Sequence, residues 1–222
     1  MIQPRRQRGL GKAAICVLGC LLSACAVSEE QIRKSSGYYQ EGLASLTTDR
    51  QRAFVSFQKS VQLNPKNRDA HYGLGHIYAQ QGKYEEAERE FRTVLDLDPE
   101  HSESHTYLGQ VLAQRKRWPE AIEAFKAALA NPLYATPDLA RFHLGRALVQ
   151  TGDLKGALGA YEDAASVKPP NVPPALLNLE LGRTYLGLGF EQRGKEALNK
   201  VVGMDTGGEY GVAAEQLLKT IK

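Results

Sequence analysis

The chain has 222 residues, of which 42% are hydrophobic, and its 28 lysines and arginines nearly balance 25 aspartates and glutamates. This balance, a formal charge of +3, gives no indication of nucleic-acid binding, for which a strongly basic surface is typical. The cysteines, Cys16, Cys20 and Cys25, all precede residue 26, so the rest of the chain has no thiol for a disulfide, a metal site or a nucleophile.

Residues 1–24 have the organisation of a cleaved export signal. Four basic residues and no acidic ones lie in 1–12, and the apolar run from Ala13 to Leu22 is shorter than the roughly 20 residues that a membrane-spanning helix needs. The sequence Leu-Ser-Ala-Cys at 22–25 resembles a bacterial lipobox, whose cysteine receives a diacylglycerol before cleavage on its N-terminal side. The alternative is an ordinary secretory signal or an uncleaved anchoring helix, in which the cysteine is incidental.

Cys25 is therefore predicted to be the first mature residue and the site of lipidation. Removal of the signal leaves 24 basic and 25 acidic residues, a formal charge of −1. Each buried acyl methylene contributes about 0.8 kcal/mol, so a multiply acylated cysteine anchors a protein to a membrane without help from the polypeptide. Residue 26 is Ala rather than Asp, which in such lipoproteins permits export to the outer membrane. We expect residues 25–34 to form a tether at the periplasmic face of the outer membrane.

A period of 34 residues runs through the sequence that follows. Gly75 and Gly109 are 34 residues apart, and so are Pro65 and Pro99. Alanines and phenylalanines recur at the same spacing, at Ala53, Ala87 and Ala121 and at Phe57, Phe91 and Phe125. This is the length of a tetratricopeptide repeat (TPR), a pair of helices joined by a turn. The sequence therefore predicts an all-α fold, a TPR superhelical solenoid of helix-turn-helix units.

Five repeats and a final helix account for the predicted TPR domain, residues 35–222. The repeats are 35–67, 68–101, 102–134, 138–171 and 175–207. Small residues such as Gly75 and Ala87 mark where two helices approach, and leucine at Ala87 would overpack this contact at a cost of roughly 1–3 kcal/mol. Residues 208–222 predict a capping helix that covers the last open face through Val212, Ala213, Leu217, Leu218 and Ile221.

Two proline-containing segments interrupt the period, NPLYATPD at 131–138 and PPNVPP at 169–174. Irregular connections on a regular scaffold often carry function. In the first segment we expect Leu133 and Tyr134 to be exposed and to form a loop for contact with a partner. The alternative for both segments is a linker that the solenoid tolerates, a stiff one in the second case.

The first helix of each repeat is expected to line the concave face, so the repeat register predicts a stripe of groove residues. The middle of this stripe is polar and rich in glutamine, and its two ends carry aromatic and leucine side chains. Such a surface suits an extended or helical peptide. The residues predicted to contact a partner are Tyr39, Tyr72, His76, Gln80, Thr106, Gln110, Gln114, Phe142, Arg146, Gln150 and Arg183. Leu43, Leu179 and Leu186 also belong to the stripe, but for the end residues the alternative is packing, of Leu179 and Leu186 under the final helix and of Tyr39 and Leu43 against the tether.

No catalytic or metal site is predicted. His101 and His105 have the i, i+4 spacing of a helical zinc pair, but the intervening glutamate is misplaced for a zinc protease and packing explains His105. The sequence shows no Ser/His/Asp pattern, phosphate loop or carboxylate pair, so we expect neither an enzyme nor a cofactor or small-molecule substrate. The groove also lacks the lysine and asparagine pattern by which co-chaperone repeats clamp a C-terminal carboxylate.

The lipobox, the tandem repeats and the passage NPLYATPDLARFHLG at 131–145 together resemble the type IV pilus biogenesis lipoproteins known as PilF, PilW or Tgl. The resemblance covers essentially the whole mature chain, although about five repeats are visible where well-known members have six. It implies a pilotin, which helps secretin subunits reach the outer membrane and assemble; the implied partners are secretin subunits or other pilus-assembly proteins. The alternative is a periplasmic TPR adaptor for peptidoglycan hydrolases or synthases.

Overall fold

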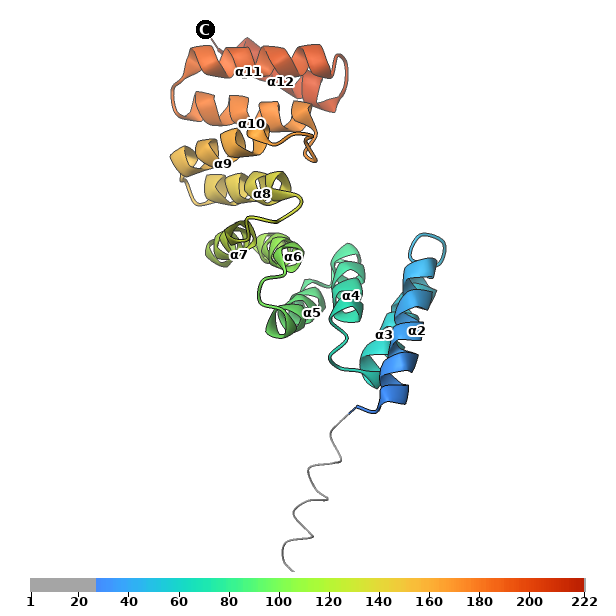
Figure 1. Cartoon of the computed structure of the whole chain (residues 1–222). Coiled ribbons are helices and arrows are strands. Elements are labelled where there is room, and N and C mark those ends of the chain that lie inside the picture. The colour runs from blue at the N-terminus through green and yellow to red at the C-terminus, as the bar shows by residue number, and fades with distance from the viewer. Residues whose placement is uncertain (1–26, 222) are drawn as a thin grey trace, which may run out of the picture.

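The computed structural model describes residues 27–221, and this part of the chain folds into helices joined by turns, with no strand (Figure 1). The predicted signal and Cys25 lie outside the described residues. The helices are α2 (Glu29–Ser45), α3 (Arg50–Leu63), α4 (Arg68–Gln80), α5 (Tyr84–Leu97), α6 (Ser102–Gln114), α7 (Trp118–Ala130), α8 (Pro137–Gln150), α9 (Leu154–Ser166), α10 (Pro174–Gly187), α11 (Glu191–Met204) and α12 (Glu209–Thr220). None of the described helices combines the length and the apolar character needed to cross a membrane.

Consecutive helices form five pairs, from α2–α3 to α10–α11, and each pair packs on the next along a curved array (Figure 1). The helices of a pair meet where a glycine of the first faces a large side chain of the second. A methyl group added at Gly75 would lie 2.8 Å from the ring of Phe91, which is fully buried. The same relation joins Gly42 to Phe57, Gly109 to Phe125, Gly145 to Tyr161 and Gly182 to Leu198. The solenoid predicted from the 34-residue period is confirmed.

The turn inside each pair from α4–α5 to α10–α11 contains a residue with left-handed backbone geometry. Gly82, after α4, has a φ of +72°, and Gly152, after α8, has a φ of +83°. The α6–α7 turn has Lys116 at this place, with a φ of +59°. A residue with a Cβ costs roughly 1–2 kcal/mol in this conformation, so the α6–α7 turn is the strained one among them.

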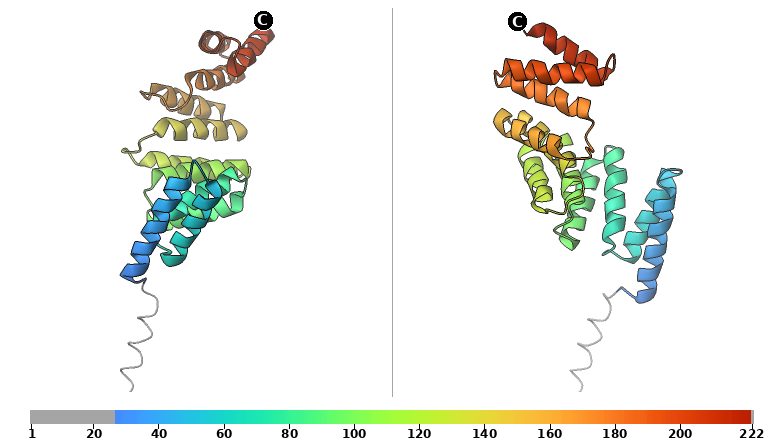
Figure 2. Two further views of the ribbon diagram at one scale, coloured as in Figure 1. Left: turned by 90° about the vertical axis from the view of Figure 1, so that its right-hand side faces the viewer. Right: turned by 45° about the horizontal axis from the view of Figure 1, so that its top comes forward.

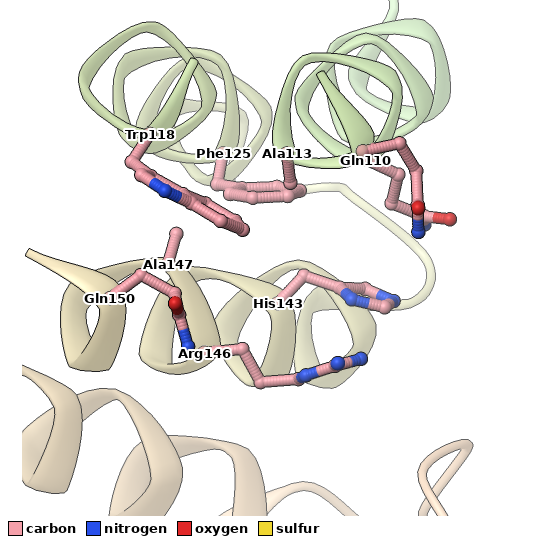
Figure 3. A pocket seen from close by; sticks show the side chains of 9 residues that line it. Gln110, Ala113, Trp118, Phe125, His143, Arg146, Ala147 and Gln150 are labelled. Atoms are coloured by element: carbon pink, nitrogen blue, oxygen red, sulfur yellow. The ribbon is translucent and has the colours of Figure 1, made fainter. Parts of the chain in front are cut away.

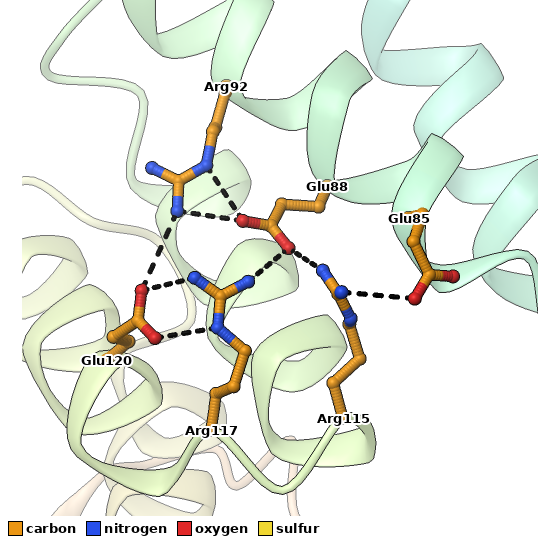
Figure 4. A network of polar contacts seen from close by, with 6 residues as sticks. All are labelled: Glu85, Glu88, Arg92, Arg115, Arg117 and Glu120. Carbon is orange, nitrogen blue, oxygen red and sulfur yellow. Dashed lines mark hydrogen bonds and ion pairs between the residues drawn. The ribbon is translucent and has the colours of Figure 1, made fainter.

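A network of ionised side chains joins α5 to the α6–α7 turn. Glu88 of α5 is only 7% exposed, and its carboxylate accepts hydrogen bonds from Arg92, Arg115 and Arg117 (Figure 4). Arg117 also donates to Glu120 at the start of α7. Burial by itself raises the pKa of Glu88, but the hydrogen bonds from Arg92 and Arg117 outweigh it and hold that pKa below its usual value. The network therefore fastens two neighbouring repeats to each other.

Helix α2 begins earlier than expected. The hydroxyl of Ser28 accepts a hydrogen bond from the main-chain N–H of Gln31, and the side chain of Gln31 accepts one from the main-chain N–H of Ser28. This reciprocal cap satisfies two N–H groups that the first turn leaves free. Residues 29–34, expected to lie in the tether, are therefore part of α2.

The capping helix is present as α12, and four of the five residues expected to face inward, Ala213, Leu217, Leu218 and Ile221, pack against the last pair of helices. Ala214 is fully buried in a cluster with Leu198 and Val201 of α11, and Leu217 packs against that cluster. Val212, expected to face inward, is 43% exposed. Because Ala214 lies nearly opposite Val212 on the helix, only one of the two can face α11.

Candidate partner-binding groove

The first helices of neighbouring repeats lie side by side on the inner face of the curve. Helix α4 contacts α6, and α6 contacts α8, whereas the second helices α5, α7 and α9 contact one another less. Helices on the inner side of a curved array approach more closely than those on the outer side. Helices α4, α6 and α8 therefore line the concave face (Figure 2).

Two cavities open between these helices and share Gln110 and Gln114 of α6; together we call them the central groove. The Arg146 cavity, of about 220 Å³, is lined by Gln110, Ala113, Gln114, Trp118, Phe125, His143, Arg146, Ala147 and Gln150. The Tyr107 cavity, of about 320 Å³, is lined by His76, Ala79, Gln80, Tyr84, Tyr107, Gln110, Val111 and Gln114.

In the Arg146 cavity, aromatic side chains of α7 face polar side chains of α8. Trp118 and Phe125 lie across the cavity from His143 and Arg146 (Figure 3). The His143 ring stacks on Phe125, with 5.9 Å between the ring centroids. Burial, together with a smaller effect of the nearby positive charge of Arg146, lowers the pKa of His143 to about 4. His143 is therefore neutral at pH 7.

The Tyr107 cavity has an aromatic wall. The ring of His76 meets Tyr107 edge to face, with 4.0 Å between centroids, and meets Tyr72 at 4.5 Å. Tyr107 in turn stacks on Phe91 at 5.9 Å. Burial lowers the pKa of His76 to about 4, so this imidazole is also neutral at pH 7. The wall therefore offers apolar surface and uncharged hydrogen-bonding groups.

The structure brings together six of the residues predicted to contact a partner. They are His76, Gln80, Gln110, Gln114, Arg146 and Gln150. Within each helix these residues are four positions apart, which places them on one face. Tyr72 lies beside them in the aromatic wall.

Two predicted groove residues are buried instead. Thr106 is 2% exposed and Phe142 is 3% exposed, so their expected exposure in the groove is wrong. The hydroxyl of Thr106 donates to the carbonyl oxygen of Ser102. Phe142 packs against Tyr161 of α9 and Val172 of the segment 169–174 in one hydrophobic cluster. Both residues lie in the first half of a first helix. The segment that follows the repeat covers each of them, 131–138 over Thr106 and 169–174 over Phe142.

The ends of the predicted stripe lie outside the central groove. Tyr39 is half-buried on α2, and Arg183 on α10 is exposed and donates a hydrogen bond of 2.8 Å to Glu180. Leu179 is buried in the cluster that α12 completes, and Leu186 packs against the same cluster. The alternative for these two leucines, packing under the final helix, is therefore confirmed.

The segment 131–138 presents one exposed apolar side chain rather than two. Leu133 is 88% exposed, as expected, but Tyr134 is only 8% exposed. The hydroxyl of Tyr134 lies 2.9 Å from Oγ1 of Thr106, and its ring packs against Ala128 and Ala140. The expected exposure of Tyr134 is wrong because this side chain anchors the loop, and Leu133 projects from the anchored loop.

The groove residues that were not predicted include Tyr84, Tyr107, Trp118 and His143. The repeat register contains a signal for them. Tyr107 and His143 each lie two residues before the helix glycine of their repeat, and Tyr84 and Trp118, which begin second helices, are one 34-residue period apart. The prediction considered the first helices alone and one stripe along them, whereas the start of each second helix also borders the groove.

The histidine pair with zinc spacing has structural contacts. Nδ1 of His101 accepts a hydrogen bond from the main-chain N–H of Ser104 and so caps α6. Nε2 of His105 lies 2.9 Å from the carbonyl oxygen of Pro99. Across residues 27–221, no cluster of three or more His, Cys, Asp or Glu side chains is arranged to hold a metal ion.

Family models of the tetratricopeptide repeat match residues 50–91, 72–136 and 139–163, about half of the chain. The chain belongs to the tetratricopeptide-repeat proteins. Among curated proteins, no sequence matches it significantly.

Several solved TPR structures have the same fold. PilF of Pseudomonas aeruginosa has a TM-score of 0.71 and 19% identity, covering 86% of this chain and 87% of PilF. PilW, described as a widely conserved type IV pilus biogenesis factor, has a TM-score of 0.67 and 23% identity, covering 76% of each chain. MamA has a TM-score of 0.67 and 23% identity, covering 77% of this chain and 91% of MamA. Such identities establish a common fold.

Proposed function

We propose that this protein is an outer-membrane lipoprotein that acts as a pilotin, binding secretin subunits of a type IV pilus system and assisting their assembly. The observation that carries the proposal is the central groove. Its glutamine amides, among them Gln110 and Gln114, can both donate to and accept from peptide groups, and its aromatic wall can bury apolar side chains. These residues lie on or at the start of packed helices, so an extended partner segment meets a preformed surface.

The predicted anchor supports a role at the membrane. Cys25 lies three residues before Ser28, the cap of α2. Three residues span at most about 10 Å even when fully extended. A lipid on Cys25 would therefore hold the solenoid, with any segment bound in its groove, close to the bilayer that a secretin enters.

The type of partner is assigned by resemblance. The fold is similar to that of PilF and PilW, and the passage 131–145 resembles pilus lipoproteins. MamA has the same fold, so the fold by itself does not indicate the partner. We base the choice of a secretin on the passage 131–145 and the lipobox.

The test is a pull-down from membranes with the tagged full-length protein. We expect secretin subunits to co-purify, and to be lost when Gln110→Ala and Gln114→Ala are combined in the groove. The matched control combines Gln51→Ala and Gln62→Ala, two exposed glutamines on α3 that line neither cavity. Capture of peptidoglycan hydrolases or synthases without a secretin would replace the pilotin role by the adaptor role.

Deletion of the gene gives a second readout. A pilotin is required for secretin multimers, so we expect the multimers and the pili to be lost. Stable secretin multimers and normal pili in the deletion strain would contradict the proposal.

A further inference from the structure

Two oxygen atoms flank the ring of His71, one at each ring nitrogen. Nδ1 lies 2.6 Å from a carboxylate oxygen of Glu90 on α5, and Nε2 lies 3.0 Å from the carbonyl oxygen of Pro65 in the α3–α4 turn. An ionised carboxylate and a carbonyl group are both acceptors, whereas a neutral imidazole has only one N–H donor. Both contacts are hydrogen bonds only when each nitrogen of His71 carries a proton, which makes the ring a cation.

The next repeat has the same histidine without the carboxylate. His105 lies one period after His71, and its Nε2 lies 2.9 Å from the carbonyl oxygen of Pro99, which matches the proline contact of His71. The residue one period after Glu90 is Ala124, whose side chain has no acceptor. A neutral ring can donate to Pro99, so the contact of His105 does not require a charge. The two repeats therefore differ in the group that meets the second ring nitrogen.

The surroundings of His71 favour the charged ring. The side chains of His71 and Glu90 are 13% and 21% exposed, so solvent screens their attraction less than at an open surface. Burial opposes a charge here, but the hydrogen bond and the charge of Glu90, with the hydrogen bond to Pro65, outweigh it and raise the pKa of His71 above the ordinary 6.5. Among the titratable groups of α3, the α3–α4 turn, α5 and α6, which border α4, Glu90 alone contributes to this shift. Tyr78 of α4 lies near Glu90, and burial raises its pKa, so its hydroxyl stays uncharged.

His71 lies in the first turn of α4, a helix that lines the concave face. The next residue, Tyr72, meets His76 edge to face in the aromatic wall of the Tyr107 cavity. Glu90 belongs to α5 and Pro65 precedes α4, so the two contacts hold this turn from two sides. A change in the contacts of His71 therefore changes how firmly one wall of the central groove is held.

We infer that His71 is a pH-sensitive clamp, which as an imidazolium fastens the start of α4 to both α5 and the α3–α4 turn and on deprotonation releases one of them. The ring gives up one proton to the solvent as the pH rises and keeps one N–H, which donates either to Glu90 or to Pro65. The part of the groove wall that α4 carries is then held less firmly. This inference does not depend on whether the protein is a pilotin.

The direct test is the protonation state of His71 in the full-length protein in detergent. The measurement is the ¹⁵N NMR shift of both ring nitrogens across a pH titration, with the signals assigned by their loss in His71→Gln. At pH 6.5 an ordinary histidine is half protonated, and we expect His71 to be mostly the imidazolium. Glu90→Gln keeps the shape of the side chain and removes its charge, so His71 should titrate at a lower pH in this variant. A mostly neutral ring at pH 6.5, or a titration that Glu90→Gln leaves unchanged, would overturn the inference.

The second test asks whether the charge holds the helix. Amide hydrogen exchange of residues 72–75 is compared between wild type and His71→Gln at the same pH, which cancels the intrinsic pH dependence of exchange. A raised folded-state pKa gives stability that is complete below the ordinary value and is lost as the pH rises through the folded-state value. We expect exchange about tenfold faster in His71→Gln at about pH 6, the effect of one charge-assisted hydrogen bond, and a ratio that shrinks towards about pH 9.

The matched control is His105→Gln, which removes the histidine with the same proline contact one period later. It should leave the exchange of residues 72–75 as in wild type at every pH. An exchange ratio for His71→Gln that stays constant from about pH 6 to about pH 9 would show a structural contact without a switch, and so would overturn the inference. If His71→Gln lost its helicity, the titrations of wild type and Glu90→Gln would still decide. No secretin enters these measurements, so failure of the pilotin proposal leaves them unaffected.

Discussion

The carboxylate of Asp138 accepts two hydrogen bonds from Asn171, one of 2.6 Å from its main-chain N–H and one of 2.9 Å from its side-chain amide. A third, of 3.0 Å, comes from the main-chain N–H of Val172. Asp138 ends the segment 131–138 and Asn171 lies in 169–174, so the two interruptions of the repeat are joined. The proline-rich connector is fixed to the start of α8 rather than acting as a free spacer.

Asp138→Asn is therefore expected to destabilise the fold by about 1.5–3 kcal/mol, because an amide NH₂ would face N–H donors that now meet a carboxylate oxygen. The measurement is the free energy of unfolding in urea. Asp163→Asn on the exposed side of α9 is the control, with an expected change within about 0.5 kcal/mol. Equal stabilities of the two variants would contradict this account.

The same carboxylate predicts a pH dependence. Burial alone raises the pKa of Asp138, but the hydrogen bonds from Asn171 and Val172 outweigh it and lower the pKa below the ordinary 3.8. A lowered folded-state pKa contributes stability that is complete above the ordinary pKa and is lost as pH falls through the folded-state value. The stability difference between wild type and Asp138→Asn should stay constant between about pH 7 and pH 5 and shrink below about pH 4. A difference that shrinks above pH 5 would assign the effect to another group.

Gly109 tests the helix contact that sets the repeat. A Cβ there would lie 2.6 Å from the fully buried ring of Phe125, which has no space to move. Gly109→Ala is expected to cost about 1–3 kcal/mol. Gly159→Ala, on the exposed face of α9 with no atom within 4 Å of the new Cβ, should instead stabilise by about 0.5–1 kcal/mol. Both are measured by thermal and urea unfolding, and the opposite signs are the critical result.

Lys116 offers a stabilising change. Its φ of +59° is a conformation that glycine adopts without strain, as Gly82 does in the preceding repeat. Lys116→Gly is expected to raise the free energy of unfolding by about 0.5–1 kcal/mol, the relief of strain less the entropy that glycine adds to the unfolded chain. Gly82→Ala should lower it by about 1 kcal/mol. A loss of stability in Lys116→Gly would show that the lysine makes a compensating contact.

The ion network at Glu88 should contribute more to the free energy of unfolding than an exposed ion pair does. Glu88→Gln leaves three guanidinium groups without their shared carboxylate, and the expected loss is about 1–3 kcal/mol because Glu88 is 7% exposed while its arginine partners are partly solvated. Glu123→Gln breaks only an exposed pair with Lys126 and should change stability by less than about 1 kcal/mol. Urea unfolding of both variants at low and high salt gives the comparison, and equal losses would contradict the role assigned to burial.

A substitution at Leu133 tests partner binding without a large effect on stability. Its side chain is 88% exposed on a loop that Tyr134 anchors, so Leu133→Ser should leave the free energy of unfolding within about 0.5 kcal/mol of wild type. If the loop contacts a partner, as the sequence predicts, membrane pull-down with this variant recovers less secretin. Met204→Ser, at an exposed apolar residue of α11, is the control. Equal recovery by the two variants would remove the loop from the binding surface.

The sequence by itself determined the repeat, the pairing of helices and six of the groove residues. Gly75 and Phe91 belong to one repeat, and their close contact requires a small residue at one position and allows a large one at the other. Because the contact recurs in other repeats, the 34-residue period of small and large residues reveals it. The same register places Gln110 and Gln114 on one face of α6, because four residues make roughly one helical turn.

Only the tertiary structure decided which side chains the irregular segments cover. Tyr134 pairs with Thr106, and Asp138 pairs with Asn171, across distances of 28 and 33 residues that no period relates. These contacts bury Tyr134, expected at the surface, and fix the connector beside the start of α8. A repeat pattern specifies contacts that recur in every unit, whereas a contact made once depends on how two adjacent repeats and the loop between them pack together.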